Sequence, residues 1–208
     1  MLKPLVWRLA TVTVLGRERL ADLRGPFVVV SNHTSHLDAP LIIGALPRRL
    51  ARYVAAGAAA DYFFDVWWRR GLTALFFNAF PVDRTGLRGK RGMATSLLDD
   101  GVPLLLFPEG TRSRTGDMGS FKPGAAALCI SRDVPCLPIG IVGAETAMPR
   151  GKNWPDRGRP PIYLAFGEPM RPDDGENAVT FSDRIAKEVT GLIDYAMDYR
   201  EQQQKDQR

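Results

Sequence analysis

Short apolar runs alternate with helix-like segments along most of the chain. Continuous apolar runs bounded by turn residues, such as FVVVS at 27–31 and VPLLLFP at 102–108, are typical of buried strands. The predicted strands are 27–31, 51–56, 79–83, 102–108, 136–142 and 162–166. One helix is predicted to begin at Pro40, and four more are predicted at 60–76, 88–99, 123–132 and 180–199. This alternation predicts a single α/β domain whose central sheet, largely parallel or mixed, is flanked by helices.

The two ends of the chain differ in pattern from the middle. In the N-terminal segment, residues 1–24, apolar side chains recur about one helical turn apart, which predicts an amphipathic helix over 2–15. Such a helix either packs on the core of the domain or lies on a membrane surface, and the pattern favours neither. The main domain is expected to cover 25–200, and the polar tail at 201–208 is expected to be disordered.

The composition is that of a globular protein with a basic surface. Hydrophobic residues make up 45% and charged residues 25% of the 208 residues, and the net charge is +5. These values exclude an intrinsically disordered chain. A basic surface suits nucleic acid, an anionic membrane or a phosphorylated substrate. Because the arginines are scattered and no nucleic-acid-binding motif accompanies them, we expect no nucleic-acid partner.

Both histidines of the chain lie in one stretch, VVSNHTSHLD at 29–38. His33 follows a predicted strand and Asp38 precedes a predicted helix, which is where catalytic groups concentrate in α/β sheets. Across this turn the carboxylate of Asp38 can fold back onto the imidazole of His33, fix its tautomer and stabilise the imidazolium. The chain has no Gly-x-Ser-x-Gly sequence. The simplest chemistry is therefore that His33 deprotonates a hydroxyl of the substrate directly.

Two other interpretations of this stretch compete with a general base. Ser35 and Asp38 could simply cap the helix that follows. Alternatively, His33, His36 and Asp38 could hold a metal ion. A zinc site would need further ligands from elsewhere, because the chain has no third histidine. We therefore expect no metal.

A second stretch, LLLFPEGTRSRTG at 104–116, carries groups suited to an anion. Gly110 permits close approach of the backbone, Thr111 offers a hydroxyl, and the planar guanidinium of Arg112 fits a phosphate. An ordinary strand-to-loop turn is the alternative interpretation. Another short predicted strand ends at Arg84. A base and two arginines thus follow the ends of several predicted strands, which is the arrangement of an anion-binding active site.

These motifs resemble those of the glycerolipid acyltransferase family. The first family motif, N-H-x-x-x-x-D, is met by Asn32, His33 and Asp38. The third, F-P-E-G-T-R-S, is met in full at 107–113, and the fourth, V-P-x-x-P-[IV], is met at 134–139. The matches fall in family order and span about half of the chain, and the resemblance implies the glycerol-3-phosphate acyltransferase-like α/β fold.

The resemblance implies a role for each matching residue. His33 is then the general base, and Asp38 is its partner. The residues that help to bind the acceptor, with an arginine on its phosphate, are then Arg84, Glu109, Gly110, Thr111 and Arg112. Arg84 belongs to the second motif, roughly G-x-x-F-[IV]-x-R, which the chain meets only in part. His36 falls in the variable interior of the first motif and inherits no role.

The implied reaction, a step of phospholipid biosynthesis, moves a fatty acyl group from a thioester to the hydroxyl of a lysophospholipid. The donor is acyl-CoA or acyl carrier protein, and the default acceptor, 1-acylglycerol-3-phosphate, gives phosphatidic acid. The resemblance implies no metal and no cofactor beyond the thioester. The alternatives are another lysolipid acceptor and a non-catalytic phospholipid-binding module. Because these lipids reside in bilayers, we expect peripheral attachment at the cytoplasmic face of the membrane, through the helix 2–15 or the aromatic and basic residues at 63–70.

Overall fold

The computed structural model describes residues 7, 9–59, 80–82, 91–113, 115–149, 151, 152 and 156–206. Its strands are β1 (Thr11–Leu15), β2 (Val28–Ser31), β3 (Ala55–Ala59), β4 (Phe80–Val82), β5 (Leu104–Leu106), β6 (Cys136–Val142) and β7 (Pro161–Phe166). Its helices are η1 (Arg17–Leu20), α2 (Asp38–Ala45), α3 (Arg48–Ala51), α6 (Arg91–Asp99), α7 (Gly124–Arg132), α8 (Ala144–Ala147) and α9 (Ala178–Asp206). Strands and helices therefore alternate through most of the chain, as the sequence predicts.

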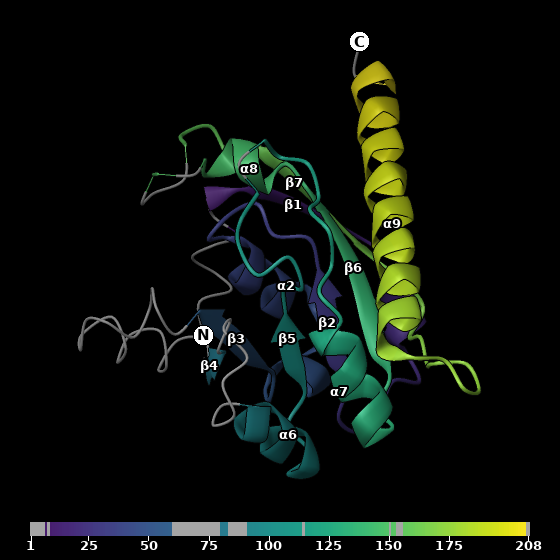
Figure 1. Cartoon of the computed structure of the whole chain (residues 1–208). Coiled ribbons are helices and arrows are strands. Elements are labelled where there is room, and N and C mark those ends of the chain that lie inside the picture. Colours follow the sequence, from purple (N-terminus) through teal and green to yellow (C-terminus); the bar gives the residue numbers. More distant parts are fainter. Residues whose placement is uncertain are drawn as a thin grey trace.

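These strands form one mixed sheet in the order β1-β7-β6-β2-β5-β3-β4 (Figure 1). The block β6-β2-β5-β3-β4 is parallel throughout. β7 runs antiparallel to β6, and β1 pairs parallel with β7 at the edge of the sheet. Since the carboxyl ends of parallel strands meet at one edge, the loops that follow β2, β5 and β6 lie at the same end of the sheet.

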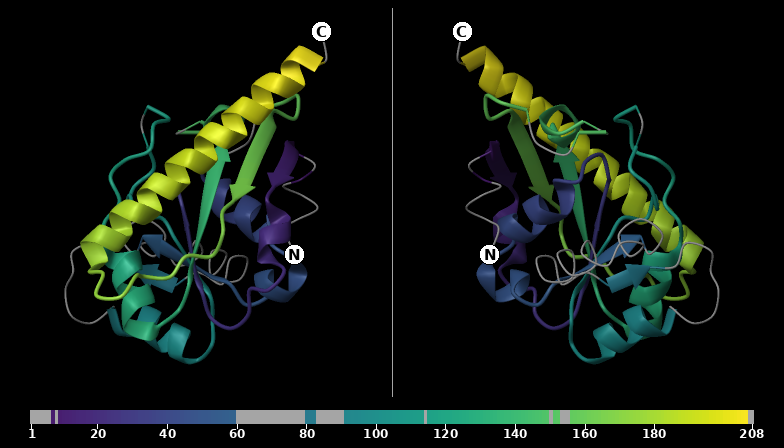
Figure 2. Two further views of the ribbon diagram at one scale, coloured as in Figure 1. Left: turned by 90° about the vertical axis from the view of Figure 1, so that its right-hand side faces the viewer. Right: turned by 90° about the vertical axis from the view of Figure 1, so that its left-hand side faces the viewer.

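Helices cover both faces of this sheet (Figures 1 and 2). On one face α2, α3, α8 and η1 bury a cluster that includes Val29 and Leu41. On the other face α6, α7 and α9 pack on a second cluster that includes Val28 and Phe181. Burial on both sides explains why the central strands are continuous apolar runs rather than alternating ones.

The longest helix, α9, packs closely against β6 at one glycine. A Cβ atom on Gly140 would lie 2.7 Å from the backbone nitrogen of Ile193 and 2.8 Å from the backbone carbon of Leu192. Such distances are too short for any side chain, so only glycine permits this approach of the two backbones. Gly140 therefore sets how closely α9 lies on the sheet.

The N-terminal segment differs from its prediction. The residues TVTVL of β1 form a strand that pairs with β7 along its whole length, so a helix over 2–15 is wrong for Thr11–Leu15. This run alternates and is rich in β-branched residues, which favours a strand once the edge of β7 is available. Because β1 and η1 belong to the sheet and its packing, the domain includes residues before position 25. Residues 1–6 and 8 of the predicted helix lie outside the described residues.

The structure differs from the predictions at the tail 201–208 and at the strand 51–56. The tail predicted to be disordered is helical as far as Asp206, because its Glu, Gln and Lys residues are good helix formers. The strand predicted at 51–56 begins later, because Arg48–Ala51 form α3 directly after Pro47. The predicted helix 60–76, with its aromatic and basic residues, lies outside the described residues. Among the helices that are described, none is long and apolar enough to cross a membrane.

Candidate active site

The loop that carries His33 begins with a side chain that ties it to β6. Asn32 donates its side-chain N–H to the carbonyl of Ile141 at 2.9 Å, and its Oδ1 accepts the N–H of Ile141 at 2.9 Å. The preceding residue, Ser31, is the last to pair with β6 through its backbone. The buried amide of Asn32 therefore continues the pairing beyond the end of β2, and it fixes the point at which the chain turns toward His33.

His33 and Asp38 come together as the sequence predicts. Nδ1 of His33 lies 2.9 Å from Oδ2 of Asp38, whose carboxylate is fully buried. The same oxygen accepts the backbone N–H groups of Thr34 at 2.7 Å and Ser35 at 2.8 Å. Because an ionised carboxylate only accepts hydrogen bonds, Nδ1 carries the proton and the lone pair lies on Nε2. The imidazole is 21% exposed, so a substrate can approach it.

Asp38 is the first residue of α2, and Leu37, which precedes it, makes no side-chain capping hydrogen bond. The Asp38 carboxylate points back to the loop that precedes it. The hydroxyl of Ser35 donates to the carbonyl of Met148 at 2.9 Å and accepts the N–H of Leu37 at 3.3 Å. Because Oδ2 of Asp38 also accepts the N–H of Ser35, Ser35 and Asp38 form the reciprocal contacts of a capping box at the start of the helix, as the capping interpretation predicts. The contact of the same Oδ2 with His33 shows that Asp38 does more than cap the helix.

The loop after β5 forms two hydrogen bonds with the backbone of His33. Oε1 of Glu109 accepts the backbone N–H of His33 at 2.7 Å, and the backbone N–H of Ser113 donates to the carbonyl of His33 at 2.8 Å. We call residues 109–113 the clasp loop. The ring of Phe107 also stacks on the imidazole of His33, with 4.0 Å between ring centroids and 16° between ring planes. The clasp loop is thereby held beside the imidazole.

Glu109 uses both of its carboxylate oxygens on backbone groups. Its Oε2 accepts the N–H of Gly119 at 2.9 Å, in addition to the contact of Oε1 with His33. Burial raises the pKa of Glu109, and its two N–H donors act in the opposite direction. The family motif implies that Glu109 binds the acceptor, which stays a prediction. Its observed contacts show that it positions the clasp loop against His33.

Six of the seven predicted site residues lie in the segments that directly follow the carboxyl ends of β2 and β5. They are His33, Asp38, Glu109, Gly110, Thr111 and Arg112. The seventh, Arg84, lies outside the described residues. In the part of the chain that the structure describes, no three His, Cys, Asp or Glu side chains form a group that could hold a metal.

His36 has no role in the family motif, but the structure places it among the charges of this site. Burial lowers the pKa of His36 to about 4, and the positive charge of Arg112 and the proximity of His33 act in the same direction, against the charge of Asp38. The imidazole of His36 is therefore neutral at neutral pH. No sequence pattern indicates this neighbourhood, because Arg112 is remote from His36 along the chain.

The variant His36→Gln is expected to make folding stability less sensitive to acid. The pKa of His36 is about 4 in the folded chain and 6.5 ordinarily, so between these values the unfolded chain binds a proton that the folded chain excludes. Stability is therefore lost as pH falls from 6.5 to about 4. The Tm from circular dichroism should drop more in the wild type than in the variant between about pH 7 and about pH 5. An equal drop in both proteins would contradict this assignment.

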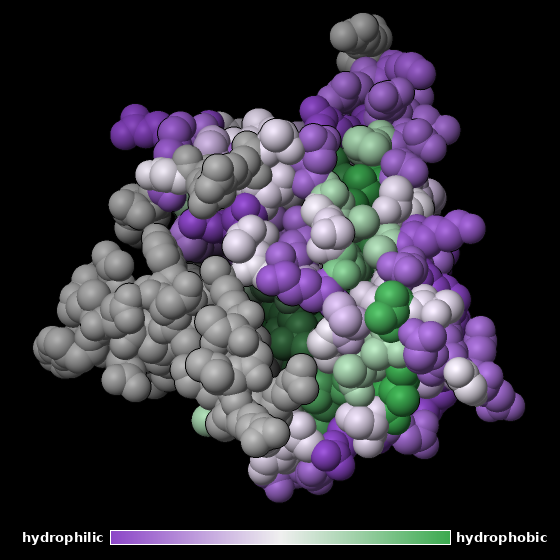
Figure 3. Space-filling view, in the orientation of Figure 1, coloured by the Kyte–Doolittle hydropathy of each residue, from purple (hydrophilic) through white to green (hydrophobic). Residues whose placement is uncertain are grey.

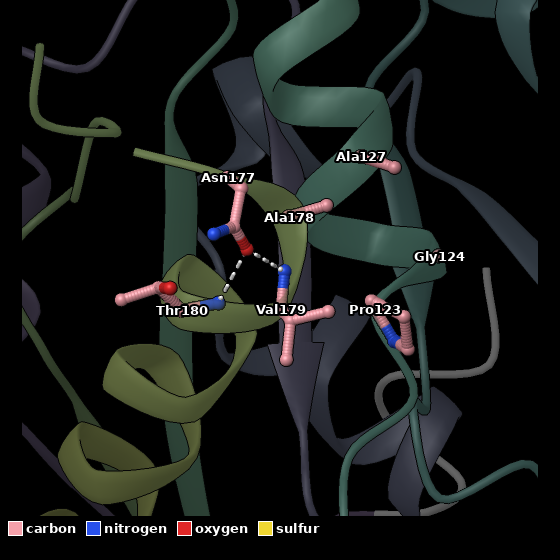
Figure 4. A pocket seen from close by; sticks show the side chains of 7 residues that line it. All are labelled: Pro123, Gly124, Ala127, Asn177, Ala178, Val179 and Thr180. Atoms are coloured by element: carbon pink, nitrogen blue, oxygen red, sulfur yellow. Dashed lines mark hydrogen bonds between the residues drawn. The ribbon is translucent and has the colours of Figure 1, made fainter. Parts of the chain in front are cut away.

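A shallow groove of about 590 Å³ lies between the start of α7 and the start of α9, apart from the motif residues. It is lined by Pro123, Gly124, Ala127, Asn177, Ala178, Val179 and Thr180. Figure 4 shows the side-chain oxygen of Asn177 accepting the N–H groups of Val179 and Thr180, at 2.9 and 3.1 Å. The side-chain amide of Asn177 therefore caps the first turn of α9.

Residues 11–142, well over half of the chain, match the family model described as Acyltransferase. The chain belongs to the Acyltransferase family. A 1-acyl-sn-glycerol-3-phosphate acyltransferase of Chlamydomonas reinhardtii is 34% identical to it over 143 residues, which cover 68% of this chain and 41% of that protein. The 1-acyl-sn-glycerol-3-phosphate acyltransferase alpha of Homo sapiens is 35% identical over 123 residues, which cover 55% of this chain and 40% of that protein.

A solved structure confirms the predicted fold class. The crystal structure of the 1-acyl-sn-glycerophosphate (LPA) acyltransferase PlsC from Thermotoga maritima is similar, with a TM-score of 0.73 and 25% sequence identity. The similarity covers 91% of this protein and 73% of that chain. The chain spans roughly half of the length of the curated relatives it matches, from 38% to 57%.

Proposed function

We propose that this acyltransferase moves a fatty acyl group from an acyl thioester to the hydroxyl of a lysophospholipid, in phospholipid biosynthesis. The observation that carries the proposal is the 2.9 Å contact between Nδ1 of His33 and the buried carboxylate of Asp38, which leaves Nε2 as a base. The proposed acceptor is 1-acylglycerol-3-phosphate and the product is phosphatidic acid, supported by relatives that are named for this acceptor. The thioester donor is acyl-CoA or acyl carrier protein.

In the proposed reaction Nε2 of His33 takes the proton of the acceptor hydroxyl as the hydroxyl oxygen attacks the thioester carbonyl carbon. A C–O bond forms, and the carbonyl oxygen becomes the oxyanion of a tetrahedral intermediate. Collapse of this intermediate breaks the C–S bond, and the departing thiolate takes the proton from Nε2. The neutral imidazole is thereby restored. No covalent intermediate on the protein is needed, because a thioester is already an activated acyl donor.

Asp38 prepares His33 for this proton transfer. Its buried negative charge stabilises the imidazolium that forms, and a buried charge acts more strongly than one in water. The N–H groups of Thr34 and Ser35 hold the carboxylate in place before the substrate arrives. Phe107 fixes the plane of the imidazole by stacking on it. The pair is therefore preorganised, and little reorganisation is needed during the reaction.

The clasp loop supplies groups for the phosphate of the acceptor. Thr111 offers a hydroxyl and Arg112 a guanidinium, and Gly110 adopts a left-handed backbone conformation with φ of 75°, which glycine tolerates without strain. We further propose that Arg84 joins them. Because the acceptor and the product are bilayer lipids, we propose peripheral attachment at the cytoplasmic face of the membrane.

The proposal is tested by offering the purified protein a mixed pool of lysolipids with acyl-CoA or acyl carrier protein. Mass spectrometry of the products should show phosphatidic acid made from lysophosphatidate, and the His33→Ala variant should make almost none. If the protein acylates another lysolipid and not lysophosphatidate, that other lysolipid is the acceptor. If neither donor acylates any member of the pool, the proposed function is wrong.

A further inference from the structure

A lysine outside the family motifs lies against the middle of the clasp loop. A Cβ atom on Gly110 would stand 3.1 Å from Nζ of Lys122, 3.6 Å from Cε and 3.9 Å from Cδ. The ammonium and the last two methylenes of Lys122 therefore lie over the backbone of Gly110. A side chain at position 110 would come into close contact with this ammonium. The absence of a Cβ atom at Gly110 therefore provides the space that the Lys122 side chain fills.

The segment that carries Lys122 is hydrogen-bonded to residues 108 and 109, at the start of the same loop. The backbone N–H of Lys122 donates to the carbonyl of Pro108 at 3.1 Å, and the N–H of Gly119 donates to Oε2 of Glu109 at 2.9 Å. Oε1 of Glu109 in turn accepts the N–H of His33. A short chain of hydrogen bonds therefore connects the backbone near Lys122 to the backbone of His33.

The clasp loop carries a second cation close in sequence to Gly110. The ammonium of Lys122 lies over Gly110, and only Thr111 separates Gly110 from Arg112. One residue spans at most ~3.6 Å, so the backbones of Gly110 and Arg112 are within ~7 Å of each other. The ammonium of Lys122 and the backbone that carries Arg112 therefore lie in the same part of the site.

The positive charge of Lys122 is not neutralised within the described residues. No carboxylate in that part of the chain forms an ion pair with Lys122. Glu109, the acid of the clasp loop, already has both oxygens engaged by backbone N–H groups. Lys122 is also exposed to solvent. An exposed ammonium beside an active-site loop is available to an anionic substrate.

We propose that Lys122 is a phosphate-binding residue of the active site and acts together with Arg112. This inference rests on the proposed function, since it concerns the substrates of that reaction. The compact ammonium of a lysine binds phosphate as a point charge, whereas the guanidinium of an arginine binds it with two parallel hydrogen bonds. Two of the proposed substrates carry phosphate groups: the lysophosphatidate acceptor and coenzyme A. The ligand chemistry is phosphate in both cases.

The test compares the wild type with Lys122→Gln, which removes the charge and keeps most of the side-chain length. Isothermal titration calorimetry gives the Kd of a short-chain lysophosphatidate, of coenzyme A and of the monoacylglycerol that lacks the phosphate. We expect the Kd of one phosphate ligand to rise about tenfold, as for the loss of one hydrogen bond to a charged group. The ligand that is affected identifies the substrate whose phosphate Lys122 binds. The Kd of the monoacylglycerol should not change.

A matched control removes a distant lysine. Lys205 lies in the last turn of α9, which projects beyond the sheet and has a hydrophilic surface (Figures 1 and 3). Lys205→Gln changes the net charge equally and should leave each Kd unchanged, whereas Lys122→Arg should restore most of the affinity. Equal losses in Lys122→Gln and Lys205→Gln would show a general charge effect and would overturn the inference.

The remaining outcomes separate this inference from the proposed function. An unchanged Kd for both phosphate ligands in Lys122→Gln overturns the role of Lys122, even if the wild type acylates lysophosphatidate. A wild type that binds neither phosphate ligand overturns it as well. A wild type that loses affinity on Lys122→Gln but acylates no lysolipid supports the phosphate site and contradicts the proposed function.

Discussion

Replacing His33 by alanine is expected to lower kcat by about 10²–10⁴-fold, with little change in the KM for the acceptor. The imidazole is the group that takes the hydroxyl proton in the proposed reaction, and Nδ1 is already committed to Asp38. Without Nε2 the acceptor must lose its proton to water. The clasp loop stays in place, because its attachments are to the backbone of His33. Steady-state kinetics with acyl-CoA and lysophosphatidate give kcat and KM separately.

The same variant must be shown to be folded. The side chain of His33 is partly exposed, so His33→Ala should unfold within a few degrees of the wild type. A variant with a similar Tm and near wild-type turnover would remove His33 from the role of base. A rise in the acceptor KM with an unchanged kcat would instead indicate that His33 only binds the substrate.

Replacing Asp38 by asparagine is the second large expected effect, a loss of about 10²–10⁴-fold in kcat. Oδ2 of Asp38 accepts Nδ1–H of His33 and the N–H groups of Thr34 and Ser35. An amide oxygen can accept the same hydrogen bonds, but it carries no charge to stabilise the imidazolium. If the amide is turned around, its NH2 group favours the wrong tautomer of His33. The acceptor Kd should change little, because Asp38 is buried behind the imidazole.

Asp38→Ala separates the electrostatic role of this carboxylate from its structural role. In that variant the backbone N–H groups of Thr34 and Ser35 lose their acceptor, which costs about 1–3 kcal/mol for each buried donor left unpaired. The Tm should therefore fall further in Asp38→Ala than in Asp38→Asn, while both variants lose turnover. Near wild-type turnover in Asp38→Asn would contradict the assigned role of the charge.

Much of the sheet is predictable because burial on both faces leaves continuous apolar runs. The bounds predicted for β6, 136–142, agree with Cys136–Val142. The strand β1 is not predictable in the same way, because the helical spacing of its apolar residues competes with the alternation of TVTVL. Its pairing with β7, a strand from the far end of the chain, decides between the two.

Some contacts of the candidate site are likewise predictable from the sequence, and others are not. His33 and Asp38 are close in sequence, so their contact follows from a turn that is visible in the residues. The contacts of Glu109 and Ser113 with His33 reach the backbone of His33 from another loop, so no local pattern around His33 encodes them. The approach of Lys122 to Gly110 likewise depends on how the chain returns to the clasp loop after residue 119. Such tertiary pairings between loops become visible only in the fold.

The two hydrogen bonds that hold the clasp loop have a practical consequence for capturing the reaction. Both use the main chain of His33, so they persist when its side chain is removed. A His33→Ala protein should therefore keep a complete binding site while lacking the group that starts the chemistry. Crystals of that variant, soaked with lysophosphatidate and acyl-CoA together, are suited to trapping both substrates before transfer.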